Sequence, residues 1–336
     1  MKHATIKDIA KELNVSISTV SRALSDHPDI SLETKKRVQT VAQELHYHPN
    51  TIAKSLKQER SLIIGVVVPQ VKHFFFASIM AGITDVAYQA GFTVMICQSN
   101  DDVQREISNV HALISYRVAG LLISISSTTT RFDHFLQFKR QGLPMVFFDR
   151  VCTEVGASTV VVDDYNGAFK ATEYLIGKGY KHIGHLGGLS TLSISQLRFE
   201  GYRDAIQQSG MEWSENQVVR GGLNEENGVE SASKLLEQAP IRPDALFCVN
   251  DPVAMGAMMH LKGRGFHIPN DIAIVGFTDN PLAEIIDPPL TTVRQPAYDI
   301  GKTAAEILLD QIQNRSHRNW PVHRVLKTEL IIRKSA

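Results

Sequence analysis

The sequence predicts a small all-α N-terminal head followed by an α/β body of two doubly wound lobes, each built on a parallel β-sheet. The head is predicted because residues 1–60 form only short helical segments. The body is predicted because apolar runs of strand length alternate with helical stretches from Leu62 onward, which is typical of parallel sheets covered on both faces. The runs are too many for one modest sheet, and a new series begins after Arg150, so two lobes are expected. The expected strands are IIGVVV, TVMICQ, GLLISI, MVFF, STVVV, HIGHL, ALFCV and IAIVGF, with LKTELIIR as the last.

Serine and threonine precede the helices expected in the head. Thr5 precedes a helix over residues 6–13, and Asp8 stands three positions later, as in an approximate capping box. Ser16 precedes a second helix over residues 17–24, and Ser31 begins a third that continues to about Leu45. Helical spacing places the following residues in a shared core: Ile6, Ile9, Ala10, Leu13, Val20, Ala23, Leu24, Val38, Val41, Ala42 and Leu45.

Two helices joined by a tight turn fit a helix-turn-helix, whose second helix enters the DNA major groove. A guanidinium at position 22 suits guanine O6 and N7, which accept a bidentate pair. The alternative is an ordinary small helical cap, and the pattern alone leaves both open. The free face of the second helix carries Ile17, Ser18, Ser21 and Arg22, and the candidates for phosphate contacts are Thr5, Ser16 and Thr19.

Charge is compatible with a nucleic-acid partner but does not establish one. The whole chain of 336 residues has 35 Lys and Arg against 35 Asp and Glu. Residues 1–60 hold 10 against 7, a net of +3, and the remainder holds 25 against 28, a net of −3. A basic excess of three residues carries little weight by itself.

Three features bear on the compartment and on cofactors. No apolar run reaches the roughly 18 residues of a membrane span, and MKHATIKDIAKEL has no apolar signal-peptide core. Cys97, Cys152 and Cys248 are far apart and lie in or beside apolar runs, so buried free thiols in a reducing cytoplasm are expected. No membrane partner, no cofactor and no metal are expected, since the sequence has neither a CxxC pair nor a phosphate loop.

Long stretches of the chain resemble the LacI/GalR family of bacterial repressors. The resemblance rests on TIKDIAKELNVSISTVSRAL and ELHYHPNTIAKSL in the head. It continues in family order through FFFASIMAGI, AGLLIS, PMVFFDR, VVVDDYNGAFKATEYLI, GYKHIGHLGG, RFEGYRDAI, FCVNDPVAMGAM, IPNDIAIVGF and PPLTTVRQPAYDIG. It implies a helix-turn-helix domain at residues 1–48, a hinge helix and linker at 49–60, and a periplasmic-binding-protein-like effector and dimerisation domain at 61–336. The first lobe is expected at about 61–160 and 293–325, and the second at about 161–292 and 326–336.

The resemblance implies that the stretch TIAKSLKQ is a hinge helix, which orders when two copies meet in the DNA minor groove. A helix this short is marginal in water alone, so its folding would be coupled to binding. Leu56 matches the family's wedge leucine, which kinks the duplex. The alternative is a solvated linker. The other DNA-facing candidates are Tyr47, Asn50 and Ala53 by resemblance, with Lys54 and Lys57 facing phosphates.

The body is expected to hold a small polar effector between its lobes, because polar and aromatic residues follow the strands. By resemblance Phe75 and Phe76 wall the ligand, and Asp163 and Asp251 can cap helices as well as bind it. The string GFTDN departs from the family's Gly-Phe-Asp-Asn, which leaves open whether Thr278 or Asp279 meets the ligand. The residues that the same resemblance implies as hydrogen-bond partners of the effector are Ser126, Arg150, Asp163, Arg198, Asn250 and Asp251.

Taken together, the sequence predicts a dimeric, sequence-specific DNA-binding regulator, a repressor of a near-palindromic operator, controlled by a sugar or sugar derivative. No heptad extension follows LKTELIIR, which favours a dimer over a tetramer. The alternatives are an α/β enzyme and a sugar-binding protein that acts on the same ligands without DNA. No catalytic residues are expected, because no nucleophile–base set or GxSxG elbow is visible.

Overall fold

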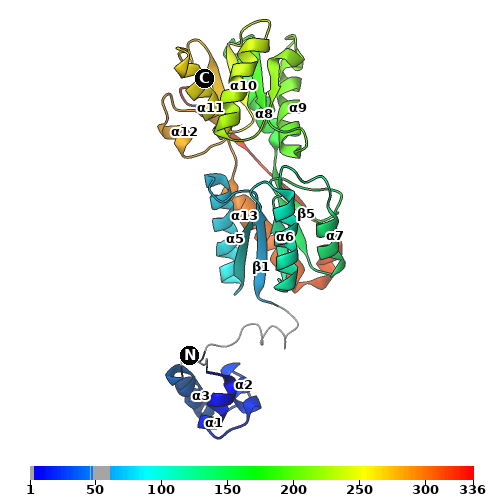
Figure 1. The fold of residues 1–336 in the computed structure, drawn as a ribbon, viewed down its shortest axis with the longest axis vertical. Helices are drawn as coiled ribbons and strands as arrows, with labels where there is room; N and C mark the ends of the chain where they lie inside the picture. The colour runs from blue at the N-terminus through cyan, green and yellow to red at the C-terminus, as the bar shows by residue number, and fades with distance from the viewer. Residues whose placement is uncertain (1–3, 46, 48–60) are drawn as a thin grey trace. The chain divides into compact units, whose positions relative to one another are not determined.

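The computed structural model describes residues 4–45, Tyr47 and residues 61–336. These residues divide into two compact units, residues 1–61 and residues 62–336. The first unit holds the three expected helices, α1 (Ile6–Glu12), α2 (Ile17–Leu24) and α3 (Leu32–Glu44) (Figure 1). The Asp8 carboxylate accepts the Thr5 backbone N–H at 2.7 Å, and the side chains of Ser16 and Ser31 accept from Thr19 N and Thr34 N. The predicted caps are therefore confirmed.

A small apolar core holds the three helices together. Its fully buried members come from all three helices, as the helical spacing predicts. Leu45 is exposed, contrary to the prediction, because α3 ends at Glu44 and Leu45 is its C-cap. Tyr47 packs against this core instead. The buried core residues are Ile9, Ala10, Val20, Ala23, Val38 and Ala42.

The second unit contains two six-stranded sheets, in agreement with the predicted α/β fold. Neighbouring strands of the first sheet are parallel throughout, in the order β11-β5-β4-β3-β1-β2. The second sheet has the order β12-β10-β9-β8-β6-β7, and only its edge strand β12 is antiparallel. The first sheet comprises β1 (Ile63–Val68), β2 (Thr93–Gln98), β3 (Gly120–Ile123), β4 (Met145–Phe148), β5 (Ser158–Val162) and β11 (His323–Leu326). The second comprises β6 (Ile183–Gly187), β7 (Val218–Arg220), β8 (Ala245–Cys248), β9 (Ala273–Thr278), β10 (Thr291–Arg294) and β12 (Glu329–Ile331).

Helices cover both faces of each sheet (Figure 1). In the first lobe, α5 and α13 pack together, and α6 packs against α7. In the second lobe the corresponding pairs are α8 with α9 and α10 with α11. These helices are α5 (Phe74–Gln89), α6 (Val103–Ser115), α7 (Asp133–Arg140), α8 (Asp164–Gly177), α9 (Ser193–Gln208), α10 (Glu225–Gln238), α11 (Asp251–Gly263) and α13 (Ala297–Gln313). Shorter pieces are α12 (Leu282–Ile285), η1 (Glu215–Gln217) and η2 (Arg315–Asn319).

The chain crosses between the lobes three times: after β5, after β10 and after β11 (Figure 1). The predicted last strand is wrong in one respect. The segment LKTELIIR does not form a single strand, since its start belongs to β11 in the first sheet and its middle to β12 in the second. The expected lobe boundaries also fall inside strands, because β5 continues to Val162 opposite Leu326 and β10 continues to Arg294.

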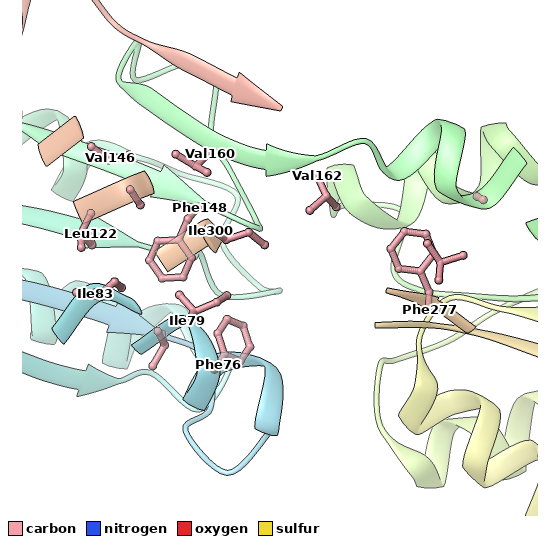
Figure 2. Packing of buried hydrophobic residues seen from close by; sticks show 14 of the residues in the cluster. Phe76, Ile79, Ile83, Leu122, Val146, Phe148, Val160, Val162, Phe277 and Ile300 are labelled. Atoms are coloured by element: carbon pink, nitrogen blue, oxygen red, sulfur yellow. The ribbon is translucent and has the colours of Figure 1, made fainter. Parts of the chain in front are cut away.

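One hydrophobic cluster continues through the crossing region and joins both lobes. Figure 2 shows Val162, at the end of β5, between the packed side chains around Phe148 and Ile300 and the ring of Phe277 on β9. All four side chains are nearly or completely buried. The ends of the two sheets are thereby held close to each other at the base of the cleft described next.

Candidate functional site

A cavity of about 290 Å³ lies where the C-terminal ends of the strands of both sheets meet. This is the position where open parallel sheets collect ligands. The first lobe contributes segments after β1, β2, β3 and β4, and the second contributes segments after β6 to β10. Its walls are Pro69, Gln70, His73, Phe75, Phe76, Asp101, Ser127, Asp149, Arg150, Leu189, Ile194, Arg198, Gly222, Leu223, Asn224, Asn227, Asn250, Pro252, Thr278, Asn280 and Gln295.

Some of the ten expected effector residues line this cavity, and others do not. The aromatic pair at the start of α5 does, and the two rings meet edge to face with centroids 5.4 Å apart. The lining members of the expected set are Phe75, Phe76, Arg150, Arg198, Asn250 and Thr278. The members outside the lining are Ser126, Asp163, Asp251 and Asp279, and each has a structural partner instead.

Ser126 is fully buried behind the cavity wall. Its backbone N–H donates to Glu106 at 2.6 Å, and its hydroxyl donates to Ser99 at 2.8 Å. Its neighbour Ser127 lines the cavity. The sequence alone did not distinguish the two adjacent serines, because the buried carboxylate that fixes Ser126 lies on α6, twenty positions earlier.

Asp163 and Asp251 also lie outside the cavity lining, and their carboxylates accept hydrogen bonds from groups of the protein. Asp163 is the N-cap of α8 and accepts from Asn166 N at 3.2 Å, so the capping alternative holds for it. Asp251 does not cap α11, because Asn250 does. Asp251 is fully buried and accepts from Thr292 Oγ1 at 2.5 Å and Asn280 N at 2.6 Å. It thereby ties the loop after β9 to β10.

At the end of β9, the two central residues of GFTDN, Thr278 and Asp279, have different surroundings. Thr278 lines the cavity, whereas the Asp279 carboxylate accepts from Arg294 Nε at 2.7 Å and Arg333 NH2 at 2.8 Å. Both residues have positive φ, 141° for Thr278 and 61° for Asp279. Such backbone strain in non-glycine residues is concentrated at functional sites. The Asp279 carboxylate is thus held by two arginines outside the cavity lining, and Thr278, which stands at the family's aspartate position, is the residue of this stretch that lines it.

Arg150 is buried and joins three loops of the first lobe. Its NH1 donates to Asp101 Oδ1, and the same oxygen accepts from Ser127 N at 2.9 Å. The Arg150 Nε is buried without a hydrogen-bond partner among the described residues. Beside it, burial raises the pKa of Asp149 to about 6, although the nearby Arg150 and Arg198 act in the opposite direction. Asp149 and Asp101 both adopt left-handed backbone conformations, with φ of 59°.

Arg198 reaches the cavity from α9. Its Nε and NH2 both donate to Asp164 Oδ1 at 2.7 Å, and its NH1 donates to the Val249 carbonyl at 2.7 Å. The guanidinium lies 3.8 Å from the centroid of the Phe277 ring. Arg198 is predicted to bond the effector, and in the structure its guanidinium nitrogens already have partners within the protein.

Several lining residues lie outside the set predicted as effector contacts. Asp101 lies three residues after β2, and the expectation that polar residues following strands meet the ligand applies to it as well. Burial lowers the pKa of His73, which shares a hydrogen bond of 2.8 Å with Gln70. Gln295 is buried and donates to Thr278 Oγ1 at 3.1 Å, and its Oε1 has no hydrogen-bond partner in the described part of the chain. Asn224 and Gln295 gave no signal, because the strands β7 and β10 before them were not predicted.

The head exposes the face that was expected to meet DNA. Ile17 is 46% exposed, and the Arg22 side chain is 58% exposed with Asp29 at 3.9 Å. The Ser16 hydroxyl caps α2 and contacts the hydroxyls of Ser18 and Thr19 at 2.7 and 2.8 Å. Thr5 and Ser21 lie on the same three-helix unit. The hinge candidates Asn50, Ala53, Lys54, Leu56 and Lys57 lie outside the described residues.

Comparisons with known proteins place both units in one family. Residues 5–50 match the model of bacterial regulatory proteins of the lacI family. Residues 61–329 match periplasmic binding proteins and the sugar binding domain of the LacI family. This chain belongs to the lacI family of bacterial regulatory proteins.

Full-length relatives agree with this membership. The HTH-type transcriptional repressor CytR of Escherichia coli (strain K12) is 34% identical over 332 residues, which cover 99% of this chain and 96% of CytR. A complex of the transcriptional regulator CelR with cellobiose has a TM-score of 0.75 at 28% identity, covering 99% of this chain and all of CelR. The lac repressor dimer bound to operator and the anti-inducer ONPF has a TM-score of 0.87 at 25% identity, with 99% of each chain covered.

As a lacI-family protein, the chain is a DNA-binding transcriptional regulator with an effector-binding body, and it is not an enzyme. The predicted family, fold and general function are confirmed. Among the described residues, none of the helices has the length and apolar character needed to cross a membrane. Within the same residues, no group of three or more His, Cys, Asp or Glu side chains is arranged to hold a metal ion.

Proposed function

We propose that this chain is a cytoplasmic, homodimeric repressor whose head binds a near-palindromic operator and whose cavity binds a carbohydrate or carbohydrate derivative. The observation that carries the effector site is the cavity at the strand ends of both lobes, with aromatic, amide and guanidinium groups in its walls. The three free cysteines, two of them buried, suit a reducing compartment.

DNA contact is assigned to the exposed face of α2. Arg22 reads a guanine, Ile17, Ser18 and Ser21 lie toward the base edges, and Thr19 faces phosphates with Thr5 and Ser16. In the hinge, Leu56 is the minor-groove wedge of each copy, with Asn50 and Ala53 also facing the groove and Lys54 and Lys57 at the phosphates. Tyr47, at the end of the head, faces the same groove. The proposed boundaries are residues 1–48 for the head, 49–60 for the hinge and 61–336 for the body.

Effector binding controls the hinge through lobe closure. The cavity draws its walls from both lobes, so a ligand that binds one lobe arrangement better shifts the population toward it. The spacing of the first lobes in a dimer then changes, and with it the distance between the two hinge segments. The two hinges form their DNA-bound arrangement only at one spacing, which makes the ligand a regulator of operator affinity.

The test compares the full chain with residues 61–336, which have their own hydrophobic cores. A duplex is selected from a randomised library by the full chain, and ligands are found from thermal unfolding with sugars, sugar acids and nucleosides. The truncated body should keep ligand binding and lose the duplex. Retained duplex affinity in the body, or turnover of the bound ligand, would overturn the proposal. DNA binding with and without the ligand then gives the sign of the coupling.

A further inference from the structure

The charged side chains at the cavity are already matched to one another. Arg150 pairs with Asp101, and Arg198 pairs with Asp164, which is itself buried. Asp149 is a further buried carboxylate in the lining. Two guanidinium groups against three carboxylates give a formal charge of 2 − 3 = −1. No guanidinium in this group therefore remains as a spare cation for an anionic ligand.

The two arginines differ in what they still offer a ligand. All three nitrogens of Arg198 already donate, to Asp164 and to the Val249 carbonyl. Arg150 uses NH1 for Asp101, but its buried Nε has no partner among the described residues. A buried unpaired N–H is costly, and a ligand acceptor that reached it would offset that cost. One neutral acceptor, such as a hydroxyl or a carbonyl, is sufficient for it.

The second unpartnered group is an amide. Gln295 lies at the crossing between the lobes, and its Oε1 is buried with no partner among the described residues. Its Nε2 donates to the Thr278 hydroxyl at 3.1 Å. Because a hydroxyl can also donate, the amide can rotate and present either a donor or an acceptor. An uncharged amide can pair with a ligand hydroxyl or amine, and it adds no positive charge to the site.

The partial positive charges of the helix N-termini at the cavity do not make the net charge of the site positive. The first turn of α10 carries Glu225 and Glu226, and the first turn of α11 carries the buried Asp251. The first turns of α5 and α9 hold no acidic residue. Each uncompensated end is equivalent to roughly half a positive charge. Their sum of roughly one is offset by the formal charge of −1 on the matched side chains.

We propose that the effector of this cavity is uncharged, a sugar, nucleoside or similar polyhydroxylated molecule without phosphate or carboxylate, and that Asp101 enforces this choice by neutralising Arg150. This inference rests on the proposed function, and it specifies the chemical class within it. A phosphate placed beside Asp101 and Asp149 would meet like charges in a partly desolvated site.

The first experiment compares matched pairs on the full chain: each neutral sugar or nucleoside of a panel against its phosphate ester at equal concentration and ionic strength. Thermal unfolding and calorimetric titration measure binding. The neutral member of the binding pair should bind at least about tenfold more tightly than its ester. An ester that binds as tightly as its neutral partner, or more tightly, overturns the proposal.

The second experiment is independent of any identified effector and uses inorganic phosphate as its probe. Asp101→Asn removes the charge, keeps an Oδ1 acceptor for Arg150 and Ser127, and suits the left-handed backbone at this position. The exposed Glu306→Gln on α13 is the control for the same change in net charge. Asp101→Asn should gain a saturable thermal stabilisation by phosphate that the wild type and Glu306→Gln lack.

Two results of this second experiment would refute the assigned role of Asp101: saturable phosphate stabilisation already present in the wild type, or no gain in Asp101→Asn. Either leaves the proposed function untouched, because operator binding by the full chain and its loss in residues 61–336 are measured separately. If the body binds no member of the panel and the full chain selects no operator duplex, the proposed function itself is rejected, and not only the role of Asp101.

Discussion

Arg198 and Asp164 form an ion pair that is almost completely withdrawn from solvent, with side-chain exposures of 3% and 2%. Two guanidinium nitrogens of Arg198 donate to the same carboxylate oxygen at 2.7 Å, and the third donates to a backbone carbonyl after β8. The pair joins α9 to the start of α8 at the wall of the cavity. Arg198 therefore has a structural role beside any contact that it makes with a ligand.

We expect Arg198→Ala to destabilise the body by roughly 3–5 kcal/mol, because it leaves the Asp164 carboxylate buried without its partner. Urea unfolding of the full chain, followed on the transition of the body, measures this. Arg203→Ala is the control, since Arg203 pairs with Asp204 at a partly exposed site and should cost at most about 1 kcal/mol. Equal losses in the two variants would contradict the structural role of Arg198.

Asp149 should make the stability of the body depend on pH in a particular direction. Burial raises its pKa to about 6 from an ordinary value of 3.8, so the folded state holds this proton more tightly than the unfolded state does. The contribution is fully present below pH 4 and is lost as the pH rises to 6 and above. Relative to Asp149→Asn, the wild type should lose about 2 kcal/mol between pH 4 and pH 7. Unfolding at several pH values measures this difference, and a difference independent of pH would contradict it.

Asp310→Asn provides a control of opposite sign. The hydrogen bond from His317, with that from Asn314 next, lowers the pKa of Asp310 on the exposed side of α13. The contribution of this carboxylate is therefore present above pH 4 and is lost as the pH falls through its lowered pKa. The two aspartates should then show opposite slopes in the same buffers.

The sequence predicts the fold because its apolar strand runs are long and their helices amphipathic. It misses β7, β10 and β11 because these strands are three or four residues long and carry exposed positions, so no apolar run marks them. The four predicted effector residues that lie outside the cavity lining are misplaced for a different reason. Ser126 and Ser127 have the same chemistry and adjacent positions, and only the three-dimensional packing of Glu106 decides which one faces the cavity.

The fate of the GFTDN stretch likewise depends on groups far away in the sequence. Asp279 is drawn to Arg294 and Arg333, fifteen and fifty-four positions later, which local reasoning does not reveal. The aromatic pair Phe75 and Phe76 is the opposite case. It lies in the first turn of α5, a short loop after the buried strand β1, so the chain places it at the ligand edge by local geometry.

Thr278 and Asp279 should separate ligand affinity from stability. Asp279→Ala removes the partner of Arg294 and Arg333, and we expect it to destabilise the body by about 1–3 kcal/mol with little change in ligand affinity. Thr278→Val removes a hydroxyl from the cavity and from Gln295, and should weaken ligand binding with a smaller loss of stability. Calorimetric titration and urea unfolding of both variants measure the two effects. If Asp279→Ala weakened ligand binding more than Thr278→Val did, Asp279 rather than Thr278 would be the residue that contacts the ligand.

Leu56→Gly should weaken operator binding and leave ligand affinity unchanged. A leucine wedge between base steps offsets the cost of unstacking, which is a few kcal/mol per step, and glycine has no side chain to insert. Glycine also disfavours the helix that the hinge needs, by about 1 kcal/mol. We therefore expect operator affinity to fall by at least about tenfold, measured on a duplex selected by the wild-type chain.

Leu45→Gly is the control for Leu56→Gly, because Leu45 is exposed at the C-cap of α3 and should tolerate glycine. If Leu56→Gly bound the operator as tightly as this control, residues 49–60 would act as a linker only, and communication between cavity and DNA would need another route.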